Sequence, residues 1–139
     1  MQTITIEWSG AFNLERLNLC GLASDKGIYA ISRFWGNRET LLYIGRTKRE
    51  FQKRLREHDT WLKLYRGQIK VRLGRIVSPN MTFSEKLLAD AECLLIILNE
   101  TVENTSSINT YSGRALTINN IGRRGKLEKR ISSDDLEDY

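Results

Sequence analysis

The sequence is poor in the residues that form cross-links and thiolate metal sites. It contains two cysteines, Cys20 and Cys93, and a single histidine, His58. This set is too small for a structural zinc site, which takes about four Cys and His ligands. Both cysteines lie among apolar residues, so we expect buried thiols in a reducing compartment and no disulfide framework.

Long apolar runs are missing as well. The longest, Cys93–Leu98, is far shorter than the roughly 20 apolar residues of a membrane-spanning helix. The first residues, Met1–Trp8, alternate between polar and apolar side chains, unlike a signal peptide. We therefore expect no membrane association and a cytoplasmic protein.

The residues that are present suit a single globular domain. The chain has 139 residues, of which 40% are hydrophobic and 28% are charged, and no internal repeat is visible. The net charge of +5 and the pI of about 9.4 favour a polyanion as partner. An ordinary solvated basic surface accounts for the same numbers, so the charge alone does not choose between the two.

Several stretches have the pattern of β-strands. Gln2–Trp8 alternates between polar and apolar residues. Gly27–Phe34 and Leu41–Gly45 flank a turn at 36–38, which predicts an antiparallel hairpin. Gln68–Val77 alternates again and predicts a third strand of the same sheet.

Two longer stretches predict helices. Apolar residues recur at steps of three and four over Arg49–Tyr65. Thr82 and Glu85 have the spacing of a capping box, so a second helix is expected from near Phe83 to about Leu98. The apolar content of this second helix predicts that it is buried.

The hairpin carries two tyrosines beside glycines. Tyr29 follows Ile28 in the first strand, and Tyr43 begins the tripeptide that ends at Gly45. Tyrosines are common in strands, where they fill the core. The hairpin would also bring the two phenols close to each other, and this allows a chemical role.

A basic run follows the hairpin. Six of the eleven residues from 46 to 56 are basic, and they are Arg46, Lys48, Arg49, Lys53, Arg54 and Arg56. A solvated helical face is the usual meaning of such a run. Arg54 lies beside the apolar stripe, where a guanidinium is well placed to bind a phosphate through two parallel hydrogen bonds.

His58 and Glu92 each occupy an apolar helical face. His58 lies within the stripe of the first helix, where it serves either the core or proton transfer. Glu92 falls at helical spacing from Leu88, Leu95 and Ile96, where a carboxylate is costly unless it is paired. Glu92 therefore predicts either a buried salt bridge, with an arginine of the preceding helix as candidate, or a ligand of a cation such as Mg²⁺.

Together these residues resemble the GIY-YIG nuclease domain. The resemblance starts with the tripeptides Gly27-Ile28-Tyr29 and Tyr43-Ile44-Gly45, at the family's usual separation. The segment 51–58 is similar to the family's segment that bears an essential arginine, here Arg54, with His58 one turn later. Glu92 fits the family's metal-binding glutamate.

Other positions match the family less specifically. Glu85 is a weaker match for the glutamate, because its place in the first helical turn is better explained by capping. A late asparagine of the family is best matched by Asn109, with Asn119 and Asn120 as open alternatives.

The resemblance implies a fold and a division of the chain. The expected fold class is α+β, a small three-stranded antiparallel or mixed sheet flanked by helices, with an extra N-terminal strand. The nuclease core would span 27–110. Residues 1–26 would form a strand and helix extension packed on it; the helix, at Phe12–Leu19, is expected from its own apolar positions. Residues 111–139 would form a C-terminal extension, with a helix from Lys126 and an acidic tail.

The resemblance also implies an activity, the hydrolysis of DNA phosphodiester bonds with one Mg²⁺ or Mn²⁺. Either Tyr29 or Tyr43 would activate water, assisted by His58. Metal-bound Glu92 and Arg54 would stabilise the charge of the transition state. The roles carried over are catalytic for Tyr29, Tyr43, Arg54, His58, Glu92 and Asn109, and substrate-binding for Arg46, Lys48 and Lys53.

Two alternatives to a DNA endonuclease stay open. The first is a nucleic-acid-binding module with the same fold and basic segment that does not hydrolyse the phosphodiester bond. RNA is the less favoured substrate, supported by Trp35 and Trp61, which stack on unpaired bases if they do not belong to the core. No base-reading module accompanies the core, so target choice would depend on a partner protein, a homodimer or DNA structure.

Overall fold

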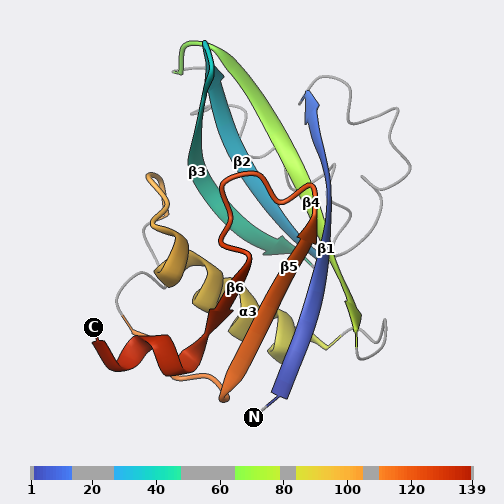
Figure 1. Ribbon diagram of the computed structural model, residues 1–139, viewed down its shortest axis with the longest axis vertical. Helices are drawn as coiled ribbons and strands as arrows, with labels where there is room; N and C mark the ends of the chain where they lie inside the picture. The colour runs from blue at the N-terminus through green and yellow to red at the C-terminus, as the bar shows by residue number, and fades with distance from the viewer. Residues whose placement is uncertain (1, 14–26, 48–64, 79–83, 105–109, 139) are drawn as a thin grey trace.

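A computed structural model describes residues 2–13, 27–47, 65–78, 84–104 and 110–138. In these ranges the chain forms one six-stranded mixed sheet, curled into a half-barrel, and one α-helix (Figure 1). The strand order is β3-β2-β4-β1-β5-β6. The elements are β1 Gln2–Asn13, β2 Gly27–Trp35, β3 Arg38–Thr47, β4 Gln68–Ser78, α3 Glu85–Asn99, β5 Leu116–Gly122, β6 Arg130–Ser132 and the 3₁₀ helix η3 Ser133–Asp138.

The predicted β2–β3 hairpin is confirmed. The strands pair antiparallel with Tyr29 opposite Gly45, and a turn at 36–37 joins them. Gly36 has a φ of 61°, a left-handed conformation that costs glycine little. β4 pairs antiparallel with the other side of β2, so the third predicted strand is confirmed as well.

The predicted fold class is wrong. The sheet has six strands instead of three, and the expected flanking helices are replaced, within the described ranges, by the single helix α3. β1, expected as an extension, lies inside the sheet, antiparallel to β4 and parallel to β5. Because Ile4 of β1, Ile118 of β5 and Ile131 of β6 enter one core, the two ends of the chain complete the sheet.

The helix α3 is close to its predicted place. It begins at Glu85, with Ser84 as the N-cap whose hydroxyl accepts a hydrogen bond from the Leu87 amide at 3.4 Å. The start therefore comes two residues later than expected, because Ser84 satisfies an amide of the first turn. α3 packs on one face of the sheet against β3, β6 and β2, and in Figure 1 the tip of the β2–β3 hairpin extends beyond it.

Both faces of the central strands are buried. The face covered by α3 includes Ile28 and Ala30 of β2 together with Ile4, Ile6 and Trp8 of β1. The alternating residues Tyr29, Ile31, Val71 and Leu73 point to the opposite face and are 0–2% exposed. Burial on both sides explains why β2 reads as an almost continuous apolar run.

The C-terminal helix predicted from Lys126 is wrong. Residues 130–132 form β6, which pairs antiparallel with β5, and a 3₁₀ helix follows. The Ser132 amide donates to the Asp135 carboxylate at 3.0 Å, and the Asp134 amide donates to the Ser132 hydroxyl at 3.2 Å. These local side-chain bonds favour a tight turn over an α-helix.

Other predictions fall partly or wholly outside the described residues. Of the helix expected at Phe12–Leu19, the first two residues belong to β1 and the rest lie outside. The helix expected at Arg49–Tyr65 lies outside except for Tyr65. None of the helices described is long and apolar enough to cross a membrane.

Candidate functional site

The two tyrosines of the tripeptides share one face of the hairpin. Tyr29 lies opposite Gly45 in the ladder, and Tyr43 lies opposite Ile31. Paired residues project to the same side of a sheet, and the side alternates along each strand, so both rings project from one face. Their centroids are 6.0 Å apart and their planes differ by 25°, which is a favourable stacked arrangement. The prediction that the hairpin brings the phenols together is confirmed.

Gly45 makes room for this pair. A Cβ at this position would overlap the end of the Tyr29 phenol and would lie 2.9 Å from the Tyr43 ring. Real side chains do not approach a Cβ so closely, so Gly45 is required by the rings and not by a turn. The first tripeptide supplies the ring and the second supplies the space for it.

The two tyrosines differ in exposure. Tyr29 has no exposed surface, whereas Tyr43 is partly buried. A group that activates a water molecule must reach solvent or substrate. Of the two candidate bases that the sequence left open, Tyr43 is therefore the accessible one.

Glu92 pairs with Arg46. The Arg46 Nε atom lies 3.6 Å from Glu92 Oε1, and the side chains are 38% and 19% exposed. The salt bridge considered for Glu92 is thus present, but its partner belongs to β3. Arg46 is therefore part of β3, whereas the rest of the basic run, from Lys48 on, lies outside the described residues. The contact exceeds hydrogen-bond length and is partly solvated, so its contribution to stability is small.

The two pairs flank the same short stretch of β3. Arg46 lies opposite Ile28, whose side chain is in the core under α3, so Arg46 and Glu92 are on the α3 face. Tyr29 and Tyr43 project from the other face. The stretch itself is two consecutive residues long: Gly45 lies beneath the rings, and Arg46 reaches Glu92.

The donor set around Glu92 suits only a cation that needs few protein ligands. The described residues contain no group of three or more His, Cys, Asp and Glu side chains that could hold a metal ion. Mg²⁺ takes one or two carboxylates and completes its shell with water and substrate phosphate. The partly exposed Glu92 carboxylate, which is paired with Arg46, fits the part of one such ligand.

Asn104 is a residue at the motif that sequence reasoning missed. Its Oδ1 accepts from the Ile44 amide at 3.0 Å, and its Nδ2 donates to the Ile44 carbonyl at 2.9 Å. The Glu103 amide donates to the Leu42 carbonyl at 2.7 Å. The segment after α3 thereby covers part of the free edge of β3, where unpaired backbone groups would otherwise face solvent. No sequence pattern marks Asn104, because its partner is backbone.

The asparagines considered as alternatives to Asn109 lie on β5, which β4 and β1 separate from β2. Asn120 is buried and accepts a hydrogen bond from Trp8 Nε1 at 2.9 Å. Its side-chain Nδ2 donates to the Glu128 carbonyl at 2.8 Å. Asn120 therefore serves the core of the sheet.

Five predicted site residues lie outside the described part of the chain. They are Lys48, Lys53, Arg54, His58 and Asn109. Their proposed roles stay predictions from the resemblance. The structure thus places Tyr29, Tyr43, Arg46 and Glu92 around the end of β3.

The hairpin tip contains a cluster that sequence reasoning recognised only through Trp35. Arg33 and Trp35 lie two residues apart at the end of β2, and Thr40 and Arg38 lie opposite them on β3. Their spacing of two in a strand was a usable signal, because it puts all four side chains on one face.

No family model matches the chain, and no curated protein or solved structure matches it either. The likeness to the GIY-YIG nucleases therefore rests on the residues of the sequence and on the arrangement of the two tripeptides.

Proposed function

We propose that the chain is a metal-dependent endonuclease that hydrolyses DNA phosphodiester bonds at the end of the β2–β3 hairpin. One observation carries this proposal. The tripeptides Gly27-Ile28-Tyr29 and Tyr43-Ile44-Gly45 meet in register, and the glycine of the second admits the tyrosine of the first. Two tripeptides that matched the motif by chance would not need to fit each other in this way.

The exposures suggest a division of labour between the tyrosines. Tyr43, which is partly exposed, takes the proton of the attacking water as the phenolate, after its own proton has been released to solvent. Tyr29, which is buried, positions Tyr43 through the stack of the two rings. Arg46 follows Gly45 on β3 but projects from the opposite, α3 face. It is proposed to bind, from that side, a phosphate that lies across the end of β3, which the guanidinium matches with parallel hydrogen bonds.

Glu92 is the residue proposed to hold the cation, Mg²⁺ or Mn²⁺. When bound, such an ion neutralises charge on a phosphoryl oxygen. Arg54, His58, Lys48, Lys53 and Asn109 keep the roles that the resemblance gives them. Localisation in the cytoplasm remains part of the same proposal.

A cleavage assay tests the assignment of roles. Labelled linear, nicked, flapped and branched DNA is incubated with Mg²⁺, and the products are separated on denaturing gels. We expect Tyr43→Phe and Glu92→Gln to lower the cleavage rate by about 10²-fold or more, as the loss of a general base or metal ligand does. Glu85→Gln is the matched control, because Glu85 is an exposed carboxylate on the same helix. Undiminished cleavage by both variants would refute the roles.

A second candidate function is a nucleic-acid-binding module without hydrolysis. The observation that favours it is that Tyr29 is fully buried while Glu92 lies on the other face, paired with Arg46. In that case the tripeptides are retained for packing. Binding of DNA without any cleavage in Mg²⁺ or Mn²⁺ would support this alternative.

A further inference from the structure

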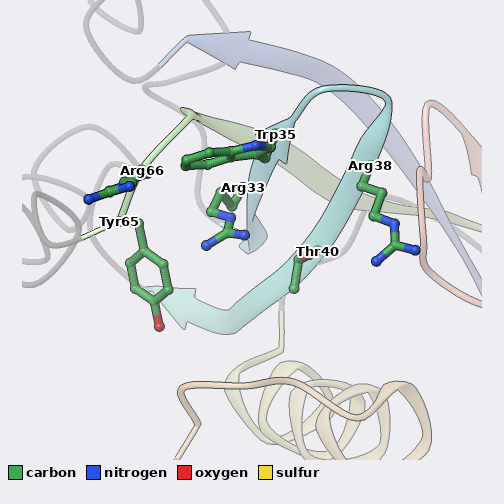
Figure 2. Close-up of a pocket in the computed structure, with 6 residues that line it drawn as sticks. All are labelled: Arg33, Trp35, Arg38, Thr40, Tyr65 and Arg66. Carbon is green, nitrogen blue, oxygen red and sulfur yellow. The ribbon is translucent and has the colours of Figure 1, made fainter.

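A basic and aromatic pocket lies at the tip of the hairpin. It has a volume of about 610 Å³ and is lined by Arg33, Trp35, Arg38, Thr40, Tyr65 and Arg66 (Figure 2). Ligand pockets commonly have volumes of about 300–1,000 Å³, so the space suits one small ligand or one unit of a polymer. Three of the six residues that line it are arginines, and none is acidic.

The aromatic residues hold Arg33 in place. Its guanidinium carbon lies 5.4 Å from the centroid of the Trp35 ring and 6.0 Å from that of Tyr65. In Figure 2 Arg33 lies below Trp35 and points towards Tyr65. The Tyr65 hydroxyl is hydrogen-bonded to the Glu103 carboxylate, which fixes that ring.

Arg33 keeps binding capacity in this position. Its side chain lines the pocket, and its contacts recorded among the residues described are with the rings of Trp35 and Tyr65 and not with an acid. The acid of the hairpin tip, Glu39, does not neutralise the pocket, because it is bound at 2.8 Å by Arg72 on the opposite face. The pocket thus presents guanidinium groups that match a phosphate.

Trp35 adds a platform for a flat ring. Its side chain is 47% exposed, although a large aromatic side chain gains by burial. A second hollow of about 460 Å³, lined by Phe34, Gly36, Gly67 and Gln68, borders Trp35 as well. An exposed indole beside guanidinium groups is the combination with which proteins bind unpaired nucleotides.

The pocket lies on the same face of the hairpin as the tyrosine pair. Tyr29, Ile31, Arg33 and Trp35 alternate along β2 and so project from one side. Four residues of strand separate Tyr29 from Arg33, or about 13 Å. This distance corresponds to roughly four nucleotides of a stacked strand.

We infer that the tip pocket binds an unpaired nucleotide of a nucleic-acid strand, with its base on Trp35 and its phosphate on Arg33, while Arg38 and Arg66, which lie on opposite sides of Arg33 in Figure 2, contact the neighbouring phosphates of the strand. The inference rests on the proposed function for the position of this nucleotide beside the cleaved bond. Binding itself needs no cation and no hydrolysis. A base within a duplex has both faces covered by its neighbours, so the pocket favours single-stranded segments.

Fluorescence anisotropy of a labelled twelve-nucleotide thymidine strand in EDTA tests the inference, since cleavage is then absent. Trp35→Ala is expected to weaken binding about fivefold or more, as loss of a base–aromatic stack does. Trp35→Phe keeps a ring and should restore most of the affinity. Circular dichroism shows whether each variant is folded.

The charge is tested by Arg38→Ala against Arg130→Ala. Both arginines are exposed, but Arg130 lies on β6 at the opposite end of the strand order. Arg38→Ala should lower the affinity and reduce the slope of log affinity against log salt by about 0.7, the value for one phosphate contact in a single strand. Arg130→Ala should leave both unchanged.

Several results would overturn the inference. They are wild-type affinity in Trp35→Ala, equal losses in Arg38→Ala and Arg130→Ala, and equal affinity for the strand and its duplex. Failure of the wild-type protein to bind the strand would overturn it too. If the pocket variants lose binding while Mg²⁺ produces no cleavage, the inference stands and the endonuclease proposal fails. If DNA is cleaved but Trp35→Ala binds the strand normally, the endonuclease proposal stands and the inference about the tip pocket fails.

Discussion

At the scale of single residues, Gly45 is the position on which the candidate site most depends. Its hydrogen side chain lets the Tyr29 ring lie over the backbone of β3 and stack on Tyr43. The two rings and the glycine therefore form one packing unit. A substitution that moves either ring should therefore change both the stability of the hairpin and the position of the Tyr43 hydroxyl.

Gly45→Ala should destabilise the protein by about 1–3 kcal/mol, the usual cost of forcing a methyl group into a filled space. Chemical denaturation measures this free energy. The same substitution in a Tyr29→Ala background should cost less, since the overlapping ring is gone. Equal costs in the two backgrounds would show that the glycine is needed for another reason.

The surroundings of Tyr111 predict how the free energy of unfolding depends on pH. Its hydroxyl donates to the Arg114 carbonyl at 2.5 Å, and Arg114 pairs with Asp90 at 2.9 Å. Burial raises the pKa of Tyr111 to about 12, helped by Asp90 and Cys93 and opposed by Arg114. The folded state thus holds the phenolic proton more tightly than the unfolded state, in which the pKa is about 10.

The contribution of the protonated Tyr111 phenol to the free energy of unfolding is therefore fully present below about pH 10 and is lost as the pH rises towards about 12. We expect the free energy of unfolding of the wild type to fall over this window, measured by urea titration at several pH values. Tyr111→Phe has no phenol to ionise and should show a smaller fall. An identical pH dependence in the two proteins would contradict this account.

At the scale of the elements, the edge of β3 is held by the segment that follows α3. Asn104 provides one donor and one acceptor to Ile44, as a neighbouring strand would. Glu103 adds a backbone bond to Leu42. The end of the candidate site is thereby fixed to the helix that carries Glu92.

Asn104→Ala should lower the free energy of unfolding by about 1–3 kcal/mol, because two backbone groups of β3 lose their partners. Val102→Ala is a control from the same segment, where a side chain that is 59% exposed should matter by less than about 0.5 kcal/mol. Thermal or urea unfolding gives both values. Equal effects would mean that Asn104 adds nothing specific to the edge.

The strands that could be predicted are those with a clear local pattern. Alternation or a nearby turn identified β1, β2, β3 and β4. β5 has no clear local pattern, because the polar Asn119 and Asn120 interrupt its apolar residues and the burial of Asn120 depends on the distant Trp8. β6 has only three residues, too few to show a period.

In the candidate site, too, only the features set by local sequence were predictable. The tyrosine pair follows from the hairpin and needs only local sequence. The pairing of Glu92 with Arg46 depends on how α3 packs against β3, which no local pattern determines. For the same reason Asn104 was missed and the number of strands was underestimated.

At the scale of the whole molecule, the hairpin tip is set apart from the part of the sheet that α3 covers (Figure 1). α3 packs against β3, β6 and β2, whereas the tip of the β2–β3 hairpin extends beyond the helix (Figure 1). The tyrosine pair and the tip pocket occupy one face of this hairpin. The net charge of +5 favours approach of a polyanion to the molecule.

The central claim is that this molecule cuts nucleic acid, and nicking of supercoiled plasmid DNA tests it most directly. The wild-type protein is predicted to convert the plasmid to nicked circles in Mg²⁺ or Mn²⁺ and to stop when EDTA is added. Glu92→Gln should be inactive beside an active Glu85→Gln control. An intact plasmid with the wild-type protein in both metals, under conditions in which the protein binds DNA, would contradict the claim.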